Sequence, residues 1–344
     1  MLNQKFLLGV ALLLAAAACQ AAEPETLTVM THDSFAVSEE VAAAFEAEHG
    51  VTIQFLKAGD AGTAVNKAAL AGDAPLADVF YGVDNTFLSR ALEEDIFEPY
   101  NSPLLAVIPA RFKLDPHNRA LPVDFGDVCL NYDIAYFEAQ NIPLPTRLED
   151  LLNPEYKDLL VVENPAASSP GLAFLFATIG HFGEEGYLDY WQGLVDNGVH
   201  VVNDWETAYY SEFSRWGGAY PLVVSYSSSP PFEVIFSEDP ISTPPTGAVT
   251  GKGACFRQIE FVGILKGAPN RALAEKWVDF MLSTTFQEDI PLQMYVFPVN
   301  RNATLDAAFE KFLAVPDEPA FLSPEDIAAN REKWIEAWME VVLR

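Results

Sequence analysis

Basic residues, histidine and cysteine are all scarce in this sequence. Its 344 residues include 20 Lys and Arg against 49 Asp and Glu, five His and three Cys, and the formal net charge is −29. Proteins that bind nucleic acid carry a basic stripe that meets the phosphates, so the lack of one argues against a nucleic-acid partner. The cysteines form no C-x-x-C pair, which argues against a zinc knuckle or a thioredoxin-like centre.

Long apolar runs are also missing, except for a short one near the N-terminus. Residues 1–18 hold one basic residue, Lys5, followed by the apolar run 6–18, and Cys19 comes next. Spanning a bilayer takes about 20 apolar residues, so this run is too short for a membrane helix. A basic start, a short apolar run and small residues before a cleavage point are typical of an export signal.

The segment Ala-Ala-Ala-Cys at 16–19 resembles a bacterial lipobox, in which the cysteine is lipidated and becomes the mature N-terminus. We therefore expect lipidation of Cys19, a tether over 19–25, and membrane contact only through this lipid anchor. The expected location is extracytoplasmic, in the periplasm or as a cell-surface lipoprotein. Cleavage near Ala22 without a lipid is the alternative.

Export also bears on the two remaining cysteines, Cys129 and Cys255. Outside the cytoplasm two leftover thiols tend to form a disulfide, so we expect this pair to be bridged. A bridge over so long a loop contributes about 4–5 kcal/mol in the chain-entropy model. Two separate buried thiols are the alternative.

Short apolar segments alternate with amphipathic helical patterns along the mature chain. Ser38 is a predicted N-cap, with acidic residues in the next turn, and Gly50 is a predicted helix stop. Alternating strands and helices indicate βαβ units and a parallel sheet. Strands are predicted over 27–30, 51–56, 76–81, 159–162, 199–202, 222–225 and 259–265, and helices over 39–49, 64–70, 87–92, 172–179, 187–195, 207–216, 271–281 and 324–343.

Two such α/β groups lie on either side of the extended stretch 121–132, and a second crossing is expected near 253–261. Two crossings between two α/β lobes are typical of a two-lobe periplasmic binding protein-like fold of type II, which closes by a hinge around its ligand. The predicted divisions are lobe 1 over 26–124, lobe 2 over 125–256, the return to lobe 1 over 257–304, and a C-terminal helical segment over 305–344.

Catalytic motifs are not found. The sequence has no G-x-S-x-G elbow, and its five His are dispersed. The segment 247–253 resembles a phosphate loop but has the wrong glycine spacing and lacks the Ser or Thr that holds magnesium. We therefore expect no enzyme activity, no cofactor and no metal site.

Polar and aromatic residues instead gather at strand-to-helix junctions, where α/β sheets bind ligands. Asp60 lies between a strand and a helix, Trp205 precedes a helix, and Tyr226 ends an apolar strand. Ser168 and Ser169 open a helix, whose free amides can meet an oxygen-bearing ligand. Each feature taken alone also has an ordinary explanation, as a helix cap or as a core aromatic residue.

Segments spread over nearly the whole mature chain resemble the thiamine-binding periplasmic subunits of ABC importers, a family related to the ferric-iron binding proteins. The segments that carry this resemblance are LTVMTHDSF at 27–35, KAGDAG at 57–62, ADVFYGVDN at 77–85, PVDFGDVCLNYD at 122–133, ENPAASSPGLAF at 163–174, NDWETAYY at 203–210, VVSYSSSPPF at 223–232 and AANREKWIEAW at 328–338.

The resemblance implies a ligand site between the lobes and a substrate-binding role without catalysis. His32 and Tyr295 stand where the family has a Tyr and a Trp, so both are further candidates, as are the nearby Asp33, Asp84 and Tyr209. The family's ligand-binding positions correspond to Asp60, Ala61, Ser168, Ser169, Trp205, Tyr226, Ser227, Ser228 and Ser229.

Thiamine suits such a set of residues. Its thiazolium ring is permanently positive and cannot lose its charge on burial, so the protein must compensate for that charge. Indole and phenol faces attract cations by about 0.5–2 kcal/mol each, and an Asp adds opposite charge. The expected partners are thiamine or thiamine phosphate and an ABC transporter permease, with the binding protein itself a monomer.

Three other ligand or reaction classes remain open. The adjacent Tyr209 and Tyr210 could bind ferric iron with His32 and Asp60 as further ligands, which is the main alternative function. Against iron, neighbouring helical side chains point about 100° apart. Spermidine or another organic cation is the second alternative, and a thiamine-cleaving enzyme that uses Cys129 as its nucleophile is the third.

Overall fold

The protein is described from a computed structural model that covers residues 25–305, 307–316 and 318–344. The predicted export signal over 1–18, Cys19 and nearly all of the predicted tether lie outside the described residues. Within the described ranges, no helix is both long enough and apolar enough to cross a bilayer.

One lobe is built on parallel strands near the N-terminus. Strands β1 (Glu25–Thr31), β2 (Val51–Lys57) and β3 (Val79–Asp84) pair in the order β2-β1-β3. The predicted Ser38 cap is confirmed, because its side chain accepts the Val41 amide, and Gly50 ends the helix in the left-handed conformation. The helices of this lobe are α1 (Glu39–His49), α2 (Ala61–Ala71) and α3 (Leu88–Glu93).

The other lobe repeats this arrangement in the middle of the chain. Strands β6 (Leu160–Glu163), β7 (His200–Val202) and β8 (Leu222–Tyr226) are parallel, and β9 (Thr246–Val249) is antiparallel to the strand described next. The helices of this lobe are α4 (Ile134–Gln140), α5 (Ser169–Asp196) and α6 (Ser229–Ile235).

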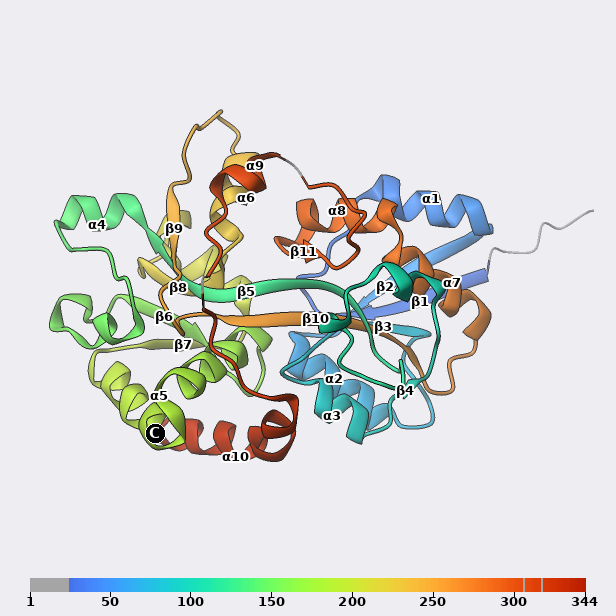
Figure 1. Ribbon diagram of the computed structural model, residues 1–344, viewed down its shortest axis with the longest axis horizontal. Helices are drawn as coiled ribbons and strands as arrows, with labels where there is room; N and C mark the ends of the chain where they lie inside the picture. The colour runs from blue at the N-terminus through green and yellow to red at the C-terminus, as the bar shows by residue number, and fades with distance from the viewer. Residues whose placement is uncertain (1–24, 306, 317) are drawn as a thin grey trace, which may run out of the picture.

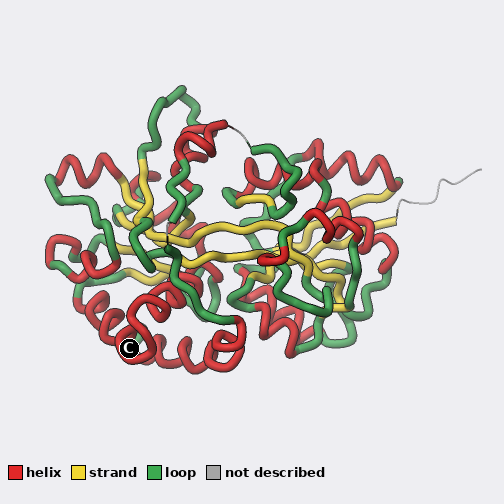
Figure 2. Tube along the Cα trace, viewed as in Figure 1, coloured by secondary structure: helices red, strands yellow, loops and turns green. Residues whose placement is uncertain are grey.

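Two long strands join the lobes, and Figure 1 shows them running side by side through the middle of the molecule. They are β5 (Leu121–Asp133) and β10 (Phe256–Leu265), which pair antiparallel and complete one sheet in the order β2-β1-β3-β10-β5-β8-β6-β7. Helices cover both faces of this sheet (Figure 2). The predicted α/β fold with hinge crossings is therefore confirmed. Among the described strands, β5 and β10 are the two that connect the strands of one lobe to those of the other.

The chain after β10 returns to the first lobe and then runs back across the molecule. Helices α7 (Arg271–Leu282) and α8 (Thr284–Met294) and the short strand β11 (Phe297–Pro298) lie in the first lobe, where a short β4 (Phe97–Glu98) also pairs with β10. After α9 (Ala307–Phe312), the final helix α10 (Pro324–Val342) packs on α5 and α3, so it contacts both lobes. Its Trp334 and Trp338 are buried.

Several helix predictions were wrong in detail. The predicted helix over 207–216 is instead a π-helical turn over Thr207–Glu212, closed by the Phe213 amide on the Ala208 carbonyl, and then a 3-10 turn. The predicted helices over 172–179 and 187–195 are one helix, α5, broken at Gly183, where φ is 75°. Helices α4, α6 and α8 and strand β9 were not predicted.

The two predicted partner cysteines meet at the junction of the lobes. Cys129 on β5 and Cys255, which precedes β10, are joined by a disulfide with a Cα–Cα distance of 4.4 Å, and both side chains are fully buried. The link closes a long segment of chain that includes all of α5 and the strands of the second lobe, and it ties together the two crossing strands near one end.

Candidate functional site

The carboxyl ends of the lobe strands face a cleft between the two lobes. Its remaining cavity has a volume of about 110 Å³. The first lobe and its return segment contribute His32, Ser34, Asp60, Glu260, Gln293, Met294, Tyr295 and Val296, and the second lobe contributes Ser169, Pro170, Trp205, Glu206, Tyr210 and Tyr226. Sequence segments far apart in the chain therefore form a single site.

Asp60 is placed at the edge of this cleft by its position as the N-cap of α2. One carboxylate oxygen accepts the Ala61 amide at 2.7 Å, and the other accepts the Trp205 amide of the opposite lobe at 3.4 Å. Burial raises the pKa of Asp60, while the Ala61 amide and the nearby His32 oppose that rise. Asp60 thus combines capping with a carboxyl group that faces the cleft.

Trp205 forms an aromatic wall on the other side of the cleft. Its ring stacks on Tyr209 with a centroid distance of 5.1 Å and an interplanar angle of 15°, and its indole N–H donates to Ser225 Oγ at 3.0 Å. The rings of Tyr210, Tyr226 and Tyr295 lie 5.5–6.3 Å away at steep angles. Only 8% of Trp205 remains exposed, so the residue is both packed and part of the cleft lining.

The predicted serines lie at the base of the cleft rather than on its open surface. Ser169 accepts a hydrogen bond from Gln258 on β10 at 2.8 Å. Of the five predicted serines, Ser169 is the one found among the residues that line the cavity. The hydroxyl of Ser168 is buried and has no hydrogen-bond partner among the described residues. The other three are buried after β8: Ser227 and Ser228 lie in the turn before α6 and Ser229 is the first residue of α6, and Ser228 donates to the Tyr295 carbonyl.

The lobes touch one another across the cleft. The Gly62 amide donates to the Ala167 carbonyl at 3.1 Å, and the Tyr210 hydroxyl donates to the Tyr295 hydroxyl at 3.1 Å. Pockets that enclose drug-sized ligands span about 300–1,000 Å³, which is larger than this cavity. A ligand of that size therefore enters only after the lobes separate about β5 and β10.

The phenols of Tyr209 and Tyr210 do not converge. Tyr209 is buried and donates to Glu233 at 2.7 Å, whereas Tyr210 points to Tyr295, and the two rings are nearly perpendicular at 89°. Bidentate capture of one metal ion by these phenols would require both to rotate away from their partners.

The chain matches the family model described as "Bacterial extracellular solute-binding protein" over residues 74–323. The chain belongs to this family. A thiamine-binding periplasmic protein of Salmonella typhimurium is 30% identical and aligns over 97% of this chain and 98% of its own length. A thiamine-binding periplasmic protein of Brucella suis is 28% identical, with 93% of each chain covered.

Solved structures agree with this assignment to the solute-binding family. A periplasmic thiamin binding protein superposes with a TM-score of 0.81 at 27% identity, covering 93% of this chain and 97% of its own. A ferric binding protein from Campylobacter jejuni has a TM-score of 0.74 at 18% identity, covering 92% and 99%, and shows the shared fold alone. Type II periplasmic binding proteins are thus the structural neighbours of this solute-binding protein.

Sequence reasoning named Asp84 and His32 singly but missed the buried acidic cluster beside the cleft to which they belong. The strand pairing sets Asp84 on β3 and Asp124 on β5 on either side of Glu260 on β10. The Tyr81 hydroxyl donates to Asp124 at 2.6 Å and Glu260 lies 3.1 Å away, while His32 Nε2 is 3.2 Å from the other oxygen of Glu260. Only the register of the crossing strands brings these residues together.

The charges in this cluster are unequal. Burial, with Glu260 nearby, holds the pKa of Asp124 well above its usual value, and burial raises the pKa of Asp84 to about 7. Burial also acts to raise the pKa of Glu260, but His32 and the hydrogen bonds from Asp124 and Tyr81 outweigh it and lower that pKa. Glu260 is therefore the carboxylate that keeps its negative charge and faces the cleft.

The other predicted acidic residues do not line the cavity. Asp84 accepts the Thr86 hydroxyl and the Phe87 amide in the turn before α3, and Asp33 accepts the Gly59 amide at 2.8 Å in an exposed loop. Ala61 and Tyr209 lie buried just behind the lining residues Asp60 and Trp205. Binding roles for these positions, as for the rest of the predicted set, remain predictions.

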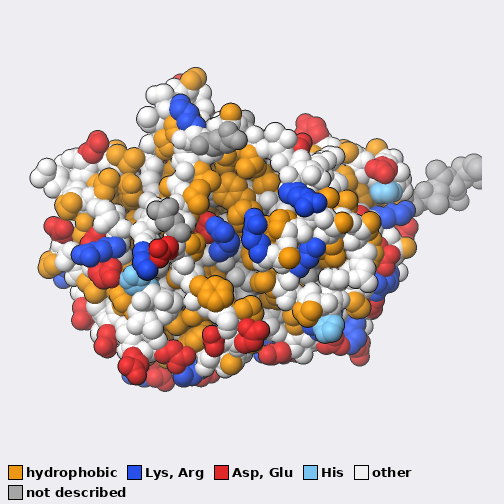
Figure 3. All heavy atoms as spheres, viewed as in Figure 1, with side chains coloured by type: hydrophobic (Ala, Val, Ile, Leu, Met, Phe, Trp, Pro, Cys, Tyr) orange, Lys and Arg blue, Asp and Glu red, His pale blue; other side chains and the backbone are white. Residues whose placement is uncertain are grey.

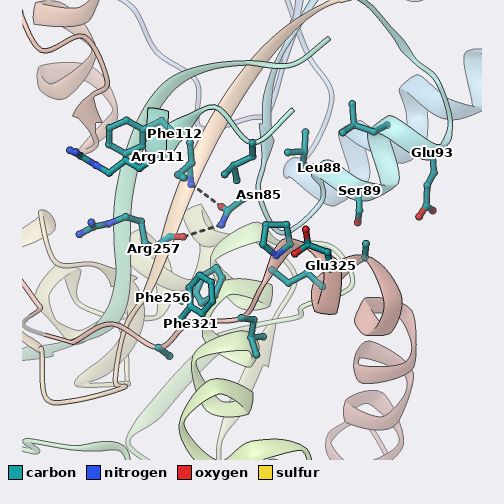
Figure 4. A pocket seen from close by; sticks show the side chains of 18 residues that line it. Asn85, Leu88, Ser89, Glu93, Arg111, Phe112, Phe256, Arg257, Phe321 and Glu325 are labelled. Atoms are coloured by element: carbon teal, nitrogen blue, oxygen red, sulfur yellow. Dashed lines mark hydrogen bonds between the residues drawn. The ribbon is translucent and has the colours of Figure 1, made fainter. Parts of the chain in front are cut away.

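A larger cavity of about 520 Å³ lies on the other face of β10, where Ile259 and Arg257 alternate with the cleft-facing Gln258 and Glu260. Figure 4 shows that its wall is mainly apolar, with Phe321 and Phe256 on one side and the helix of Leu88 opposite. Basic side chains cross the middle of this face, and acidic ones gather along its lower edge (Figure 3). Arg257 is already paired with Asp127 at 2.8 Å.

Proposed function

We propose that this solute-binding protein captures thiamine in the cleft between its lobes and delivers it to the permease of an ABC importer. The observation that carries the proposal is the composition of the cleft. Asp60, Glu206 and Glu260 line it with four aromatic side chains, and among the described lining residues there is no Lys or Arg. An acidic, aromatic cleft stabilises a flat organic cation.

The proposal also covers the oligomeric state, location and lipidation of the protein. The protein acts as a monomer outside the cytoplasm, carries a lipid on Cys19, and catalyses no reaction on its ligand. Relatives named as thiamine-binding and periplasmic support both the ligand and the location. Ser169, at the start of α5, would face the ligand's hydroxyethyl tail or its phosphate ester.

Ferric iron is the less favoured ligand on structural grounds. Each of the paired phenols already has its own partner, and Trp205 would have no role in an iron site. One calorimetric screen separates the two functions: thiamine, thiamine monophosphate, thiamine diphosphate and ferric citrate are titrated into the protein. Heat of binding with thiamine or its esters supports the proposal, and binding of ferric citrate alone contradicts it.

Replacing Asp60 with Asn should weaken thiamine binding by at least about tenfold, because a charge-assisted contact contributes about 1.5–3 kcal/mol. The same change should not lower thermal stability. Since the pKa of Asp60 is raised in the folded protein, the charged form opposes folding at pH values above its ordinary pKa, and the amide removes that cost.

The matched control is Asp73→Asn, at an exposed position just beyond the opposite end of α2. Calorimetry and thermal unfolding of both variants check the prediction. If the affinity of Asp60→Asn equals that of the wild type, Asp60 only caps the helix.

A further inference from the structure

His32 lies between the cleft and the acidic cluster. It follows β1, only 7% of it is exposed, and its ring packs 5.6 Å from that of Tyr81. The backbone makes room for it at Gly82, where φ is +105° and an added Cβ would lie 2.2 Å from the imidazole. The ring is therefore fixed in one place, with its Nε2 toward Glu260.

Every ionisable group that faces this imidazole is acidic or phenolic. Burial acts to lower the pKa of His32, but the carboxylates around it outweigh burial and raise the pKa above its usual value. The groups next to the imidazole are Glu260 from β10, Asp60 from the N-cap of α2, Asp33 from the loop after β1 and Tyr81 from β3. Asp124 and Asp84 lie one strand further away, on either side of Glu260.

The imidazole thus holds the position that a cationic ligand needs. Both His32 and Glu260 line the cavity, as does Asp60, so a permanently positive ring in the cleft lies next to the same two carboxylates that His32 faces. Two positive charges beside the same carboxylates weaken binding, since like charges a few ångströms apart in a protein repel each other. Of the two cations, only the imidazolium can become neutral.

We infer that His32 and Glu260 form a charge-exchange pair that selects permanently cationic ligands: the imidazolium passes its proton to solvent as the ligand enters, and Glu260 then serves as the counter-ion of the ligand. Bonds and charges balance, because the His32 imidazolium loses one N–H proton to solvent when one positively charged ligand ring enters the cleft. This inference rests on the proposed function. It adds Glu260 to the residues that the family resemblance indicated, and it gives His32 a specific role.

Thiamine affinity should therefore increase with pH. Since binding removes a proton from His32, the affinity should be lower at about pH 6 than at about pH 8.5 by at least about fourfold, the change expected for an imidazole of ordinary pKa, about 6.5. Calorimetry in two buffers of different ionisation enthalpy should show that each binding event releases up to one proton at about pH 6.

The variant His32→Gln tests the assignment, and His200→Gln is its control because His200 is a half-buried imidazole stacked on Tyr220 outside the cleft. The first should bind thiamine with no proton release and a nearly flat pH profile, and the second should behave like the wild type. If His32→Gln does not fold, NMR titration of the wild-type imidazole still decides, since thiamine should lower the pKa of His32.

Three results would overturn the inference. A wild-type affinity that does not change with pH overturns it while leaving thiamine binding intact. Proton release that persists in His32→Gln assigns the proton to the carboxyl groups of the cluster instead. A protein that binds no thiamine at any pH removes both the inference and the proposed function.

Discussion

Trp205→Ala is expected to lower thiamine affinity by at least about tenfold, because it removes one aromatic face that contributes about 1–2 kcal/mol or more of stacking and cation–π attraction. Trp205 is well suited to this role, since Tyr209 backs one face of the ring and Ser225 holds its indole N–H at 3.0 Å. The ring therefore loses little freedom when it meets a ligand.

The size of this effect is measured by calorimetry beside two reference variants. Trp205→Phe keeps an aromatic face and should lose less affinity than Trp205→Ala. Trp216→Ala removes a half-exposed indole that is covered by Arg215 and does not line the cleft, so it should bind like the wild type. Unchanged affinity in Trp205→Ala, with the fold intact by circular dichroism, would remove Trp205 from the site.

Loss of the Cys129–Cys255 bridge is expected to be the largest change in stability. The two cysteines are 126 residues apart in the chain, and closing a loop of that length contributes about 4–5 kcal/mol by restricting the unfolded state. Reductant should therefore lower the denaturation midpoint strongly, and Cys129→Ala with Cys255→Ala should lower it to a similar extent. Reductant should have no further effect on the double variant.

Chemical denaturation with and without reductant checks this prediction. Thiol titration of the unfolded, unreduced protein provides an independent count of free cysteines. Two reactive thiols at Cys129 and Cys255, or a midpoint that does not respond to reductant, would contradict the bridge in the exported protein.

Local sequence signals predicted most strands and helices because each signal acts within one turn or one strand. Ser38 caps α1 and Gly50 ends it as expected, and the alternation of apolar segments identified the parallel strands of both lobes. The π-helical turn at Thr207–Glu212 could not be predicted in this way, because the packing of Trp205 and Tyr209 on β8 determines it.

The cleft could be predicted only in part. Asp60, Trp205 and Tyr226 stand at strand ends, where the topology of α/β sheets favours ligand sites, and all three line the cavity. Glu260 gave no comparable signal, since it lies within an apolar strand in a chain rich in acidic residues. Its role depends on the register that sets it between Asp84 and Asp124, and register is a long-range property of the sheet.

A crystal structure of the protein grown with thiamine would show whether the cleft between the lobes holds the vitamin. Thiamine is expected between the lobes, with its rings against Trp205 and its positive charge beside Asp60 and Glu260. An interlobe cleft that stays empty at saturating thiamine, or a metal ion held there by Tyr209 and Tyr210, would contradict this expectation.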